Sequence, residues 1–361
     1  NHDNDGATPC DENTDWNASA KYRKAFGPTY YSFNIGRIHY IMLDDQIYHN
    51  EPRPDAKMGK GIVGSRNHTT ALTRAQLDWL AKDLATVTDK NTPIVIGVHS
   101  PIFRYKDYMY PPVDCRLPAE QRDEFVALFK EFPTVHILSG HTHRNRCCYG
   151  RDDAAQPDIA NFTEHTVAAV SGTRWHTSAF GGPQIAVTGE PAGCKIFKIA
   201  DRDIKWYFKA TEFSADTQFR CFDMNGVSDF YRTSGQMRVF LDHFPKRTDY
   251  GKDKFRDKVM IHVWDWANDW KIEVTEDGKP LEVVRQKAEN PQYVLSYEIP
   301  KRLWMFNLNS ASSRKKIRHP HMFHVSPLSP TSTLEVTVTD CFGNKYHQTM
   351  ERPKPFHLHM K

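Results

Sequence analysis

The sequence lacks the marks of several protein classes. None of its apolar runs approaches the ~20 residues that a transmembrane helix needs. It has no block of like charges, and its formal net charge is only +4 over 361 residues. A nucleic-acid-binding tail and a polybasic membrane patch are therefore not indicated. It also has no internal repeat, and with 39% hydrophobic and 25% charged residues its composition is that of a globular protein.

Cysteine pairs at metal-binding spacing are absent as well. The seven cysteines are scattered apart from Cys147-Cys148, and none form a CxxC pair, so a zinc ribbon is not indicated. One or two long-range disulfides would fit an exported protein, and reduced thiols would fit a cytosolic one. The chain opens on "NHDNDG", without an initiator Met or a signal peptide. We therefore expect it to be a fragment of a longer protein.

What is present begins with a regular alternation of strands and helices. Mostly apolar runs predict strands over 37–45, 93–98 and 134–138, and amphipathic patterns predict helices over 73–87 and 119–132. The order strand, helix, strand, helix, strand is typical of a layered α/β domain. Because the strand runs are apolar, we expect the sheet to be covered on both faces.

The first predicted helix carries a clear start signal. Thr73 is a typical N-cap, and Gln76 follows three residues later, as in a capping box. Four apolar residues then share one face at helical spacing: Leu77, Leu80, Leu84 and Val87. This face is expected to pack on the sheet.

The hydrophobicity pattern of the sequence changes after about Ala210. Short stretches of alternating polarity appear, with turn signals at Asp277-Gly278 and Gly343-Asn344. Alternation with such turns predicts antiparallel strands. We therefore expect an α/β domain over 1–210 and a small antiparallel, sandwich-like β domain over 211–361.

Polar side chains gather where the predicted strands end. His99 follows "IVIGV", His141 and His143 follow "VHILSG", and Asp44 and Asp45 follow "HYIML". Ligand sites of α/β sheets lie outside the carboxyl ends of the strands. Neutral imidazole is a common ligand of zinc, iron and manganese, so this pattern favours a metal site.

The Gly-His-Thr-His stretch also predicts a local geometry. Gly140 suits a sharp exit from the strand that brings the backbone close to an ion. Histidines at i and i+2 of a turn can face one centre while Thr142 points away.

Most other histidines and tryptophans are interpreted as structural. His39, His136 and His262 are expected to be ordinary core or surface residues with satisfied hydrogen bonds rather than metal ligands. The group His319, His321 and His324 favours a β-domain strand over a second metal site. The tryptophans are expected mainly in the core rather than in a sugar-stacking platform: Trp264, Trp266, Trp270 and Trp304.

Three short motifs together resemble one family. "NHD" at the start, "GVHSP" at 97–101 and "SGHTH" at 139–143 resemble three consecutive blocks of the calcineurin-like metallophosphoesterases, which are related to the purple acid phosphatases. This likeness covers about residues 1–210. The part after it resembles the accessory β domain of a bacterial branch of the family, which implies a location outside the cytoplasm.

The resemblance implies a site with two divalent ions of manganese, iron or zinc. Asn1, His99 and His141 would bind the second ion and His143 the first. His2 would lie near the phosphoryl group and Asp3 would orient it. A hydroxide that bridges the ions would attack the phosphorus of a phosphate ester.

The family's first two motif blocks, which supply one histidine and two aspartates, are not in the printed sequence. We therefore expect this chain to hold no ion or one ion and to catalyse little by itself. Asp44 or Asp45 could in principle replace the missing carboxylates, but in the family this position is a supporting residue.

Several residues near the motifs are candidates for substrate binding. Arg104 follows the "HSPIF" stretch, Arg144 and Arg146 follow the second histidine motif, and Trp175 and His176 follow "VSGTR". Arginine binds phosphate oxygens well, although charged loop residues are often merely solvated.

The leading hypothesis is thus hydrolysis of a phosphate ester. One alternative is a non-catalytic ligand- or carbohydrate-binding protein on a decayed phosphoesterase scaffold. Another is a mononuclear metallohydrolase that uses only the histidines present. No nucleic-acid partner is indicated, and the oligomeric state is not addressed by the sequence.

Overall fold

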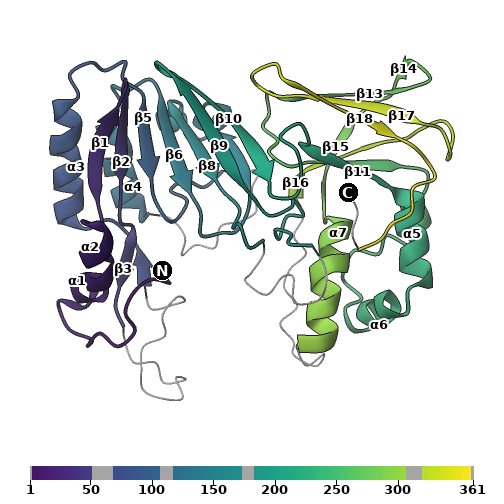
Figure 1. The fold of residues 1–361 in the computed structure, drawn as a ribbon, viewed down its shortest axis with the longest axis horizontal. Helices are drawn as coiled ribbons and strands as arrows, with labels where there is room; N and C mark the ends of the chain where they lie inside the picture. The colour runs from purple at the N-terminus through teal and green to yellow at the C-terminus, as the bar shows by residue number, and fades with distance from the viewer. Residues whose placement is uncertain (1, 51–67, 106–116, 173–182, 306–318, 359–361) are drawn as a thin grey trace. The chain divides into compact units, whose positions relative to one another are not determined.

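The computed structural model describes residues 2–50, 68–105, 117–172, 183–305 and 319–358 (Figure 1). These residues form two compact units. The first contains 1–142, 148–166 and 199–204, and the second contains 143–147, 167–198 and 205–361. The division expected near residue 210 stays a prediction.

The first unit is built on a six-stranded sheet in the order β1-β2-β5-β6-β8-β7. Strands β2, β5, β6 and β8 are parallel neighbours, and β1 pairs with β2 antiparallel. The strands are β1 (Tyr31–Ile35), β2 (Ile38–Met42), β5 (Ile94–Gly97), β6 (Val135–Ser139), β7 (Arg146–Tyr149) and β8 (Phe162–Thr166). A separate two-stranded ribbon joins β3 (Gln46–Tyr48) and β4 (His68–Thr70).

Two helices of the first unit, α3 (Arg74–Thr86) and α4 (Ala119–Leu128), contribute apolar side chains to the same core as this sheet. Both follow the predicted pattern, and two short helices precede the sheet, α1 (Thr14–Ala18) and α2 (Ala20–Phe26). Leu77, Leu80 and Leu84 of α3 join the same core as Ile96 of β5 and Ile137 of β6. The α/β alternation predicted from the sequence is confirmed for these elements.

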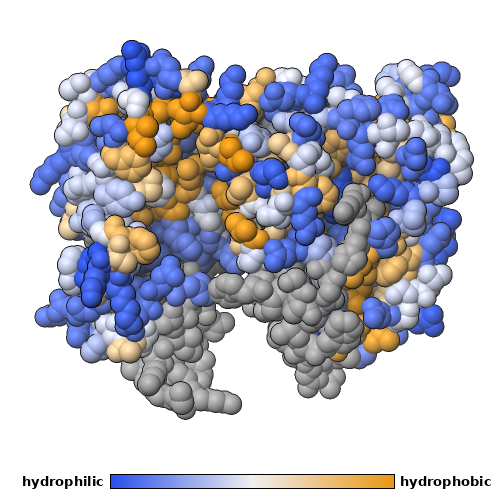
Figure 2. Space-filling view, viewed as in Figure 1, coloured by the Kyte–Doolittle hydropathy of each residue, from blue (hydrophilic) through white to orange (hydrophobic). Residues whose placement is uncertain are grey.

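The sheet is not covered on both faces along its whole width, so that expectation is wrong at one edge. The central strands β5 and β6 are buried. Along β1, however, Tyr31, Phe33 and Ile35 are exposed. Figure 2 shows hydrophobic surface over the region of β1, β2 and β5. Strand β1, with the alternating sequence YSFNI, was not among the strands predicted from apolar runs, and its sequence does not show what packs on it.

The second unit contains two antiparallel four-stranded sheets, in the orders β11-β12-β16-β15 and β14-β13-β17-β18. Its strands are β11 (Phe219–Asp223), β12 (Val259–Val263), β13 (Lys271–Glu276), β14 (Lys279–Pro280), β15 (Val284–Ala288), β16 (His319–Val325), β17 (Leu334–Thr339) and β18 (Lys345–Met350). A second two-stranded ribbon pairs β9 (Gly193–Ala200) with β10 (Asp203–Ala210), and its turn, residues 199–204, belongs to the first unit. The predicted class, an α/β domain with an antiparallel β domain, is confirmed.

The second unit also has helices that the sequence interpretation did not include. These are α5 (Met224–Thr233), α6 (Gly235–His243) and α7 (Pro291–Tyr293), which continues into π-helical turns at Val294–Glu298 and Lys301–Met305. Asp223 caps α5 by accepting a hydrogen bond from the Asn225 N–H, and Ser234 caps α6 in the same way from Met237. Aspartate and serine are both preferred N-cap residues, so the start of each helix could have been predicted from the sequence.

Candidate functional site

The ends of β5 and β6 bring His99 and His141 together. Backbone pairing between these strands continues beyond their last residues, because Val98 N–H donates to Leu138 O at 3.0 Å and Gly140 N–H donates to His99 O at 2.9 Å. Nε2 of His99 and Nδ1 of His141 lie 2.9 Å apart as a result. The meeting of these two histidines at one sheet edge is what the strand-end argument predicted.

The turn that carries the second motif differs from the prediction at Gly140. That glycine does not have positive φ, and a Cβ built on it would meet nothing nearer than His99 O at 3.8 Å. The left-handed conformation is instead adopted by His141, with φ 56°, and by His143, with φ 54°. A side chain with Cβ is uncommon there, and such residues cluster at functional sites.

A third histidine of the first unit was missed. His68 of β4 lies with its ring centroid 6.1 Å from that of His141, at an interplanar angle of 75°. The pairing of β3 with β4, in which His68 lies opposite Tyr48, fixes the position of His68. Two strands of three residues give no periodic signal, so the sequence offered no pattern from which to place His68.

Burial keeps His99 uncharged. It lowers the pKa of His99 to about 3, with further lowering by the nearby charges of His141, His68 and His2. The charge of His2 thus acts on His99, while the role that the motif resemblance implies for His2 stays a prediction. A neutral imidazole at neutral pH has a lone pair that can bind a metal ion or accept a hydrogen bond.

Asp45 fixes the backbone beneath this pair. Its carboxylate is 1% exposed and accepts hydrogen bonds from His99 N–H at 3.2 Å and Ser100 N–H at 2.8 Å. Burial raises the pKa of Asp45 to about 6. Because both oxygens are used by backbone donors, Asp45 positions His99 and is poorly placed to replace a missing metal ligand.

Asp44 is tied to helix α3 through its own backbone. Gln76 accepts from Asp44 N–H at 2.8 Å and donates to Asp44 O at 2.7 Å. Thr73 caps α3 as predicted, since its hydroxyl accepts from Gln76 N–H. The predicted capping box is wrong in its second half, because the Gln76 side chain reaches the strand end instead of Thr73.

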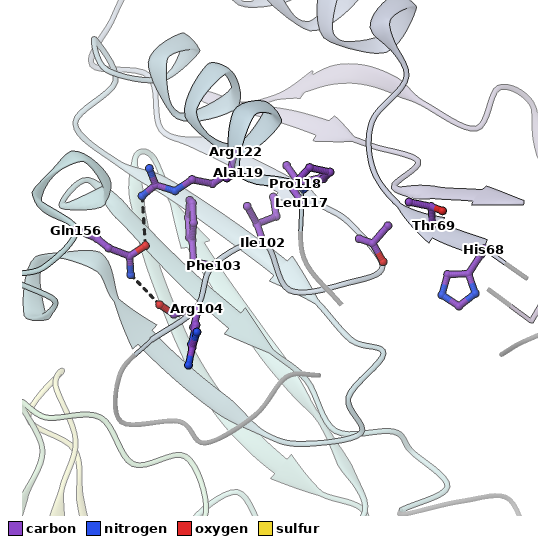
Figure 3. A pocket seen from close by; sticks show the side chains of 11 residues that line it. His68, Thr69, Ile102, Phe103, Arg104, Leu117, Pro118, Ala119, Arg122 and Gln156 are labelled. Atoms are coloured by element: carbon purple, nitrogen blue, oxygen red, sulfur yellow. Dashed lines mark hydrogen bonds between the residues drawn. The ribbon is translucent and has the colours of Figure 1, made fainter. Parts of the chain in front are cut away.

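A cavity of about 620 Å³ in the first unit includes His68 in its wall (Figure 3). Arg104, a predicted substrate-binding residue, is exposed and lies in the same wall. Figure 3 shows Gln156 between Arg122 and the Arg104 backbone, to which it donates at 2.7 Å. The wall of this cavity therefore contains the guanidinium of Arg104 and the imidazole of His68.

A buried carboxylate fixes the backbone of the loop that carries Arg104. Glu164 of β8 is fully buried and accepts from Ile102 N–H at 2.6 Å and from Phe103 N–H at 3.4 Å. These contacts fix the backbone after His99 and so fix the cavity wall.

The residues after the second motif belong to the second unit. Asn145 is fully buried; its N–H donates to Glu190, and its side-chain amide donates to Trp264 O and Asp265, each at 3.0 Å. Arg146 is 3% exposed and Arg144 is half-buried. Arg146 therefore offers a substrate very little surface, and the substrate-binding role of both arginines stays a prediction.

Some predicted site residues cannot be placed. Asn1, Trp175 and His176 lie outside the described residues, and Asp3 is exposed near the start of the chain. Within the described ranges, no group of three or more His, Cys, Asp or Glu side chains is arranged to hold a metal ion. The facing imidazoles of His99 and His141 suit a transition metal as donors, but they form a partial ligand set.

The residues interpreted as structural are confirmed where they are described. His39 pairs with Asp83 at 2.9 Å, His136 faces His165 at 3.0 Å and His262 contacts Asn290 at 3.0 Å; all three of these histidines are buried. His321 is buried in β16, and the side chain of His319 is outside the described part.

The tryptophans follow the same interpretation. Trp264, Trp266 and Trp270 are buried, as expected for core residues. The side chain of Trp304 is outside the described part.

Comparison with known proteins gives one family match. A sequence model described as the C terminal of calcineurin-like phosphoesterase matches residues 164–346, just over half of the chain. No curated protein matches it. In the described part of the chain, no helix has the length and apolarity needed to cross a membrane.

Proposed function

Because the chain belongs to the calcineurin-like phosphoesterase family, we propose that it serves in the metal-dependent hydrolysis of phosphate esters. The observation that carries the proposal is the pairing of His99 with His141 at 2.9 Å where β5 and β6 end. Both imidazoles come from strand ends, where ligands of α/β sheets bind. The left-handed backbone at His141 and His143 supports a turn shaped to position these side chains.

The proposed ligands divide as the resemblance implies. His99 and His141, with Asn1, bind one ion, and His143 binds the other. When bound, two divalent ions of manganese, iron or zinc would hold the phosphate and lower the pKa of a water between them. This follows from the family and from the imidazole donors, not from a complete site in the described residues.

The chain's own groups then act on the substrate. His2, whose charge acts on His99, would donate a hydrogen bond or a proton to the phosphoryl oxygens or the leaving oxygen. Arg104 in the wall of the 620 Å³ cavity can pair with a phosphate oxygen. The cavity wall also contains His68, whose ring centroid lies 6.1 Å from that of His141.

The carboxylates of the family's first two motif blocks are not in the printed sequence. Asp45 is occupied by backbone donors, so this chain alone is expected to bind at most one ion and to turn over little.

The test measures metal per chain after incubation with manganese or zinc, together with p-nitrophenyl phosphate hydrolysis on the same samples. We expect one ion or fewer and very low turnover, and His99→Asn or His141→Asn should abolish the metal that does bind. His243→Asn is the matched control, since His243 lies on helix α6 and should leave metal content unchanged. Two ions with rapid turnover would refute the expected shortage of ligands. Metal uptake unaffected by both variants would refute the proposed ligands.

A further inference from the structure

The second unit contains a cavity of about 390 Å³ that shares no residue with the histidine group. It opens among the loop after β10, the strand β11, the end of β12 and the strand β18. Its walls are Glu212, Phe213, Ser214, Asp216, Thr217, Phe219, Arg220, Trp264, His347 and Gln348. Neither the proposed hydrolysis nor the family match gives this cavity a role.

Arg220 is a buried cation in the wall of this cavity. It is 6% exposed, its Nε has no hydrogen-bond partner, and no carboxylate in the described ranges forms an ion pair with its guanidinium. Burial alone lowers the pKa of Arg220 to about 10. The rings of Phe213 and Trp264 lie 5.4 and 6.0 Å from its guanidinium carbon. Buried charges in proteins are ordinarily paired, so Arg220 is an exception that calls for an explanation.

A second unsatisfied donor lies in the same wall. The side chain of Trp264 is fully buried, and its indole Nε1 has no hydrogen-bond partner. Indole is only a donor and guanidinium is only a donor. The guanidinium of Arg220 in the cavity wall therefore suits a ligand that presents hydrogen-bond acceptors.

The cavity wall is held in place before any ligand binds. The side-chain amide of Gln218 donates to Phe208 O at 2.6 Å and to Ala215 O at 2.8 Å. The backbone carbonyl of Gln218 accepts from the backbone N–H of Trp264 at 3.0 Å. These bonds tie the loop with Phe213 to the strands with Arg220 and Trp264. A preformed site loses less conformational entropy when it binds a ligand.

We propose that this cavity binds a small molecule through one oxyanion group, a carboxylate or a phosphate, which accepts hydrogen bonds from the guanidinium of Arg220. The planar fork of a guanidinium matches both groups. Glu212 and Asp216 are exposed at the rim and would repel further negative charge. The remainder of the ligand is therefore neutral or cationic.

The test is calorimetric titration of the full chain with acetate, inorganic phosphate, phosphoethanolamine and citrate, with glycerol as the neutral probe. Acetate or one of the two phosphate probes should bind at one site per chain, and which one binds identifies the oxyanion. Arg220→Met should weaken that binding at least tenfold. Arg232→Met is the matched control, because Arg232 forms a surface ion pair with Asp253 in the same unit. Failure of every oxyanion to bind, or equal binding by Arg220→Met, would overturn the proposal.

A second variant covers the case in which Arg220→Met does not fold. Glu212→Gln/Asp216→Asn changes only exposed rim residues and should tighten citrate binding at least threefold, since the repulsion is removed. No change in citrate binding would contradict the assigned charge pattern. These outcomes do not depend on metal content or phosphatase activity, so they are separable from the test of the proposed hydrolysis.

Discussion

Replacing Lys195 by methionine should destabilise the second unit strongly. Lys195 and Asp265 form an ion pair at 2.8 Å, and both side chains are fully buried. Nζ of Lys195 also donates to Arg146 O at 2.9 Å, and Asp265 accepts from Asn145 at 3.0 Å. The substitution keeps an unbranched apolar stem but leaves the carboxylate without its cation.

The magnitude follows from this burial. Removing one partner of a buried pair costs about 3–5 kcal/mol, and the lost donor to Arg146 O adds roughly 1 kcal/mol. The amide of Asn145 still contacts Asp265, so we expect about 4 kcal/mol in total. At about 2–4 °C per kcal/mol for a unit of this size, the midpoint of thermal unfolding should fall by roughly 10 °C.

The pH dependence of the variant has a definite sign. Burial already raises the pKa of Asp265 in spite of Lys195, and removing the cation raises it further. A carboxyl whose folded pKa is raised contributes stability below its unfolded pKa, and that stability is lost as the pH rises. The deficit of Lys195→Met should therefore shrink in acid.

The assay is scanning calorimetry of the wild type, Lys195→Met, Asp265→Asn and the double variant. The double variant should recover at least half of the loss, because the buried charge is gone and a carbonyl still accepts from Asn145. Lys271→Met is the control; Lys271 pairs with Glu273 on the surface and should change the free energy of unfolding by less than about 0.5 kcal/mol. A loss below about 1 kcal/mol for Lys195→Met, or a double variant no better than the worse single one, would refute the reasoning.

Two further predictions concern stability. Burial raises the pKa of Glu190 from 4.5 to about 7, so the wild type should lose about 3 kcal/mol as the pH rises from 4.5 to 7; urea unfolding of Glu190→Gln should lack this loss, and an unchanged pH profile would contradict the assignment. Gly150→Ala should cost more than about 3 kcal/mol by thermal unfolding, because its Cβ would lie 1.7 Å from Ile159 O. Gly235→Ala, at the start of α6 with nothing within 4 Å, should instead gain roughly 0.5 kcal/mol, and equal effects of the two substitutions would count against the steric argument.

The parts of the fold that the sequence predicted are those with a repeating pattern. The apolar runs that became β5 and β6 and the helical spacing of Leu77, Leu80 and Leu84 in α3 rest on local periodicity, which survives folding unchanged. The meeting of His99 with His141 followed from a general rule for parallel strands. Helices α5 and α6 had legible caps and were overlooked because the surrounding alternation favoured strands.

Other parts could not be predicted because they depend on distant contacts. His68 reaches His141 only through the β3–β4 ribbon. Whether a carboxylate lies close enough to pair with Arg220 depends on residues that are distant in the sequence, and a single sequence does not show which residues surround it. The exposure of Phe33 on β1 likewise depends on what packs on the sheet, which is a tertiary property.

The turn with the second motif shows how these levels combine. A left-handed backbone at His141 and at His143 costs roughly 1–2 kcal/mol for each residue, and nothing in the local sequence offsets this. In the first unit, Gly140 N–H is bonded to His99 O. In the second unit, the side chain of Asn145 is bonded to Trp264 O and Asp265. The strained segment is therefore tied down on both sides, and the buried Lys195–Asp265 pair stabilises the second tie. Strain persists only where the surrounding structure over-determines the backbone, and within the second unit the hydrogen bonds of Asn145 restrain the chain just after His143.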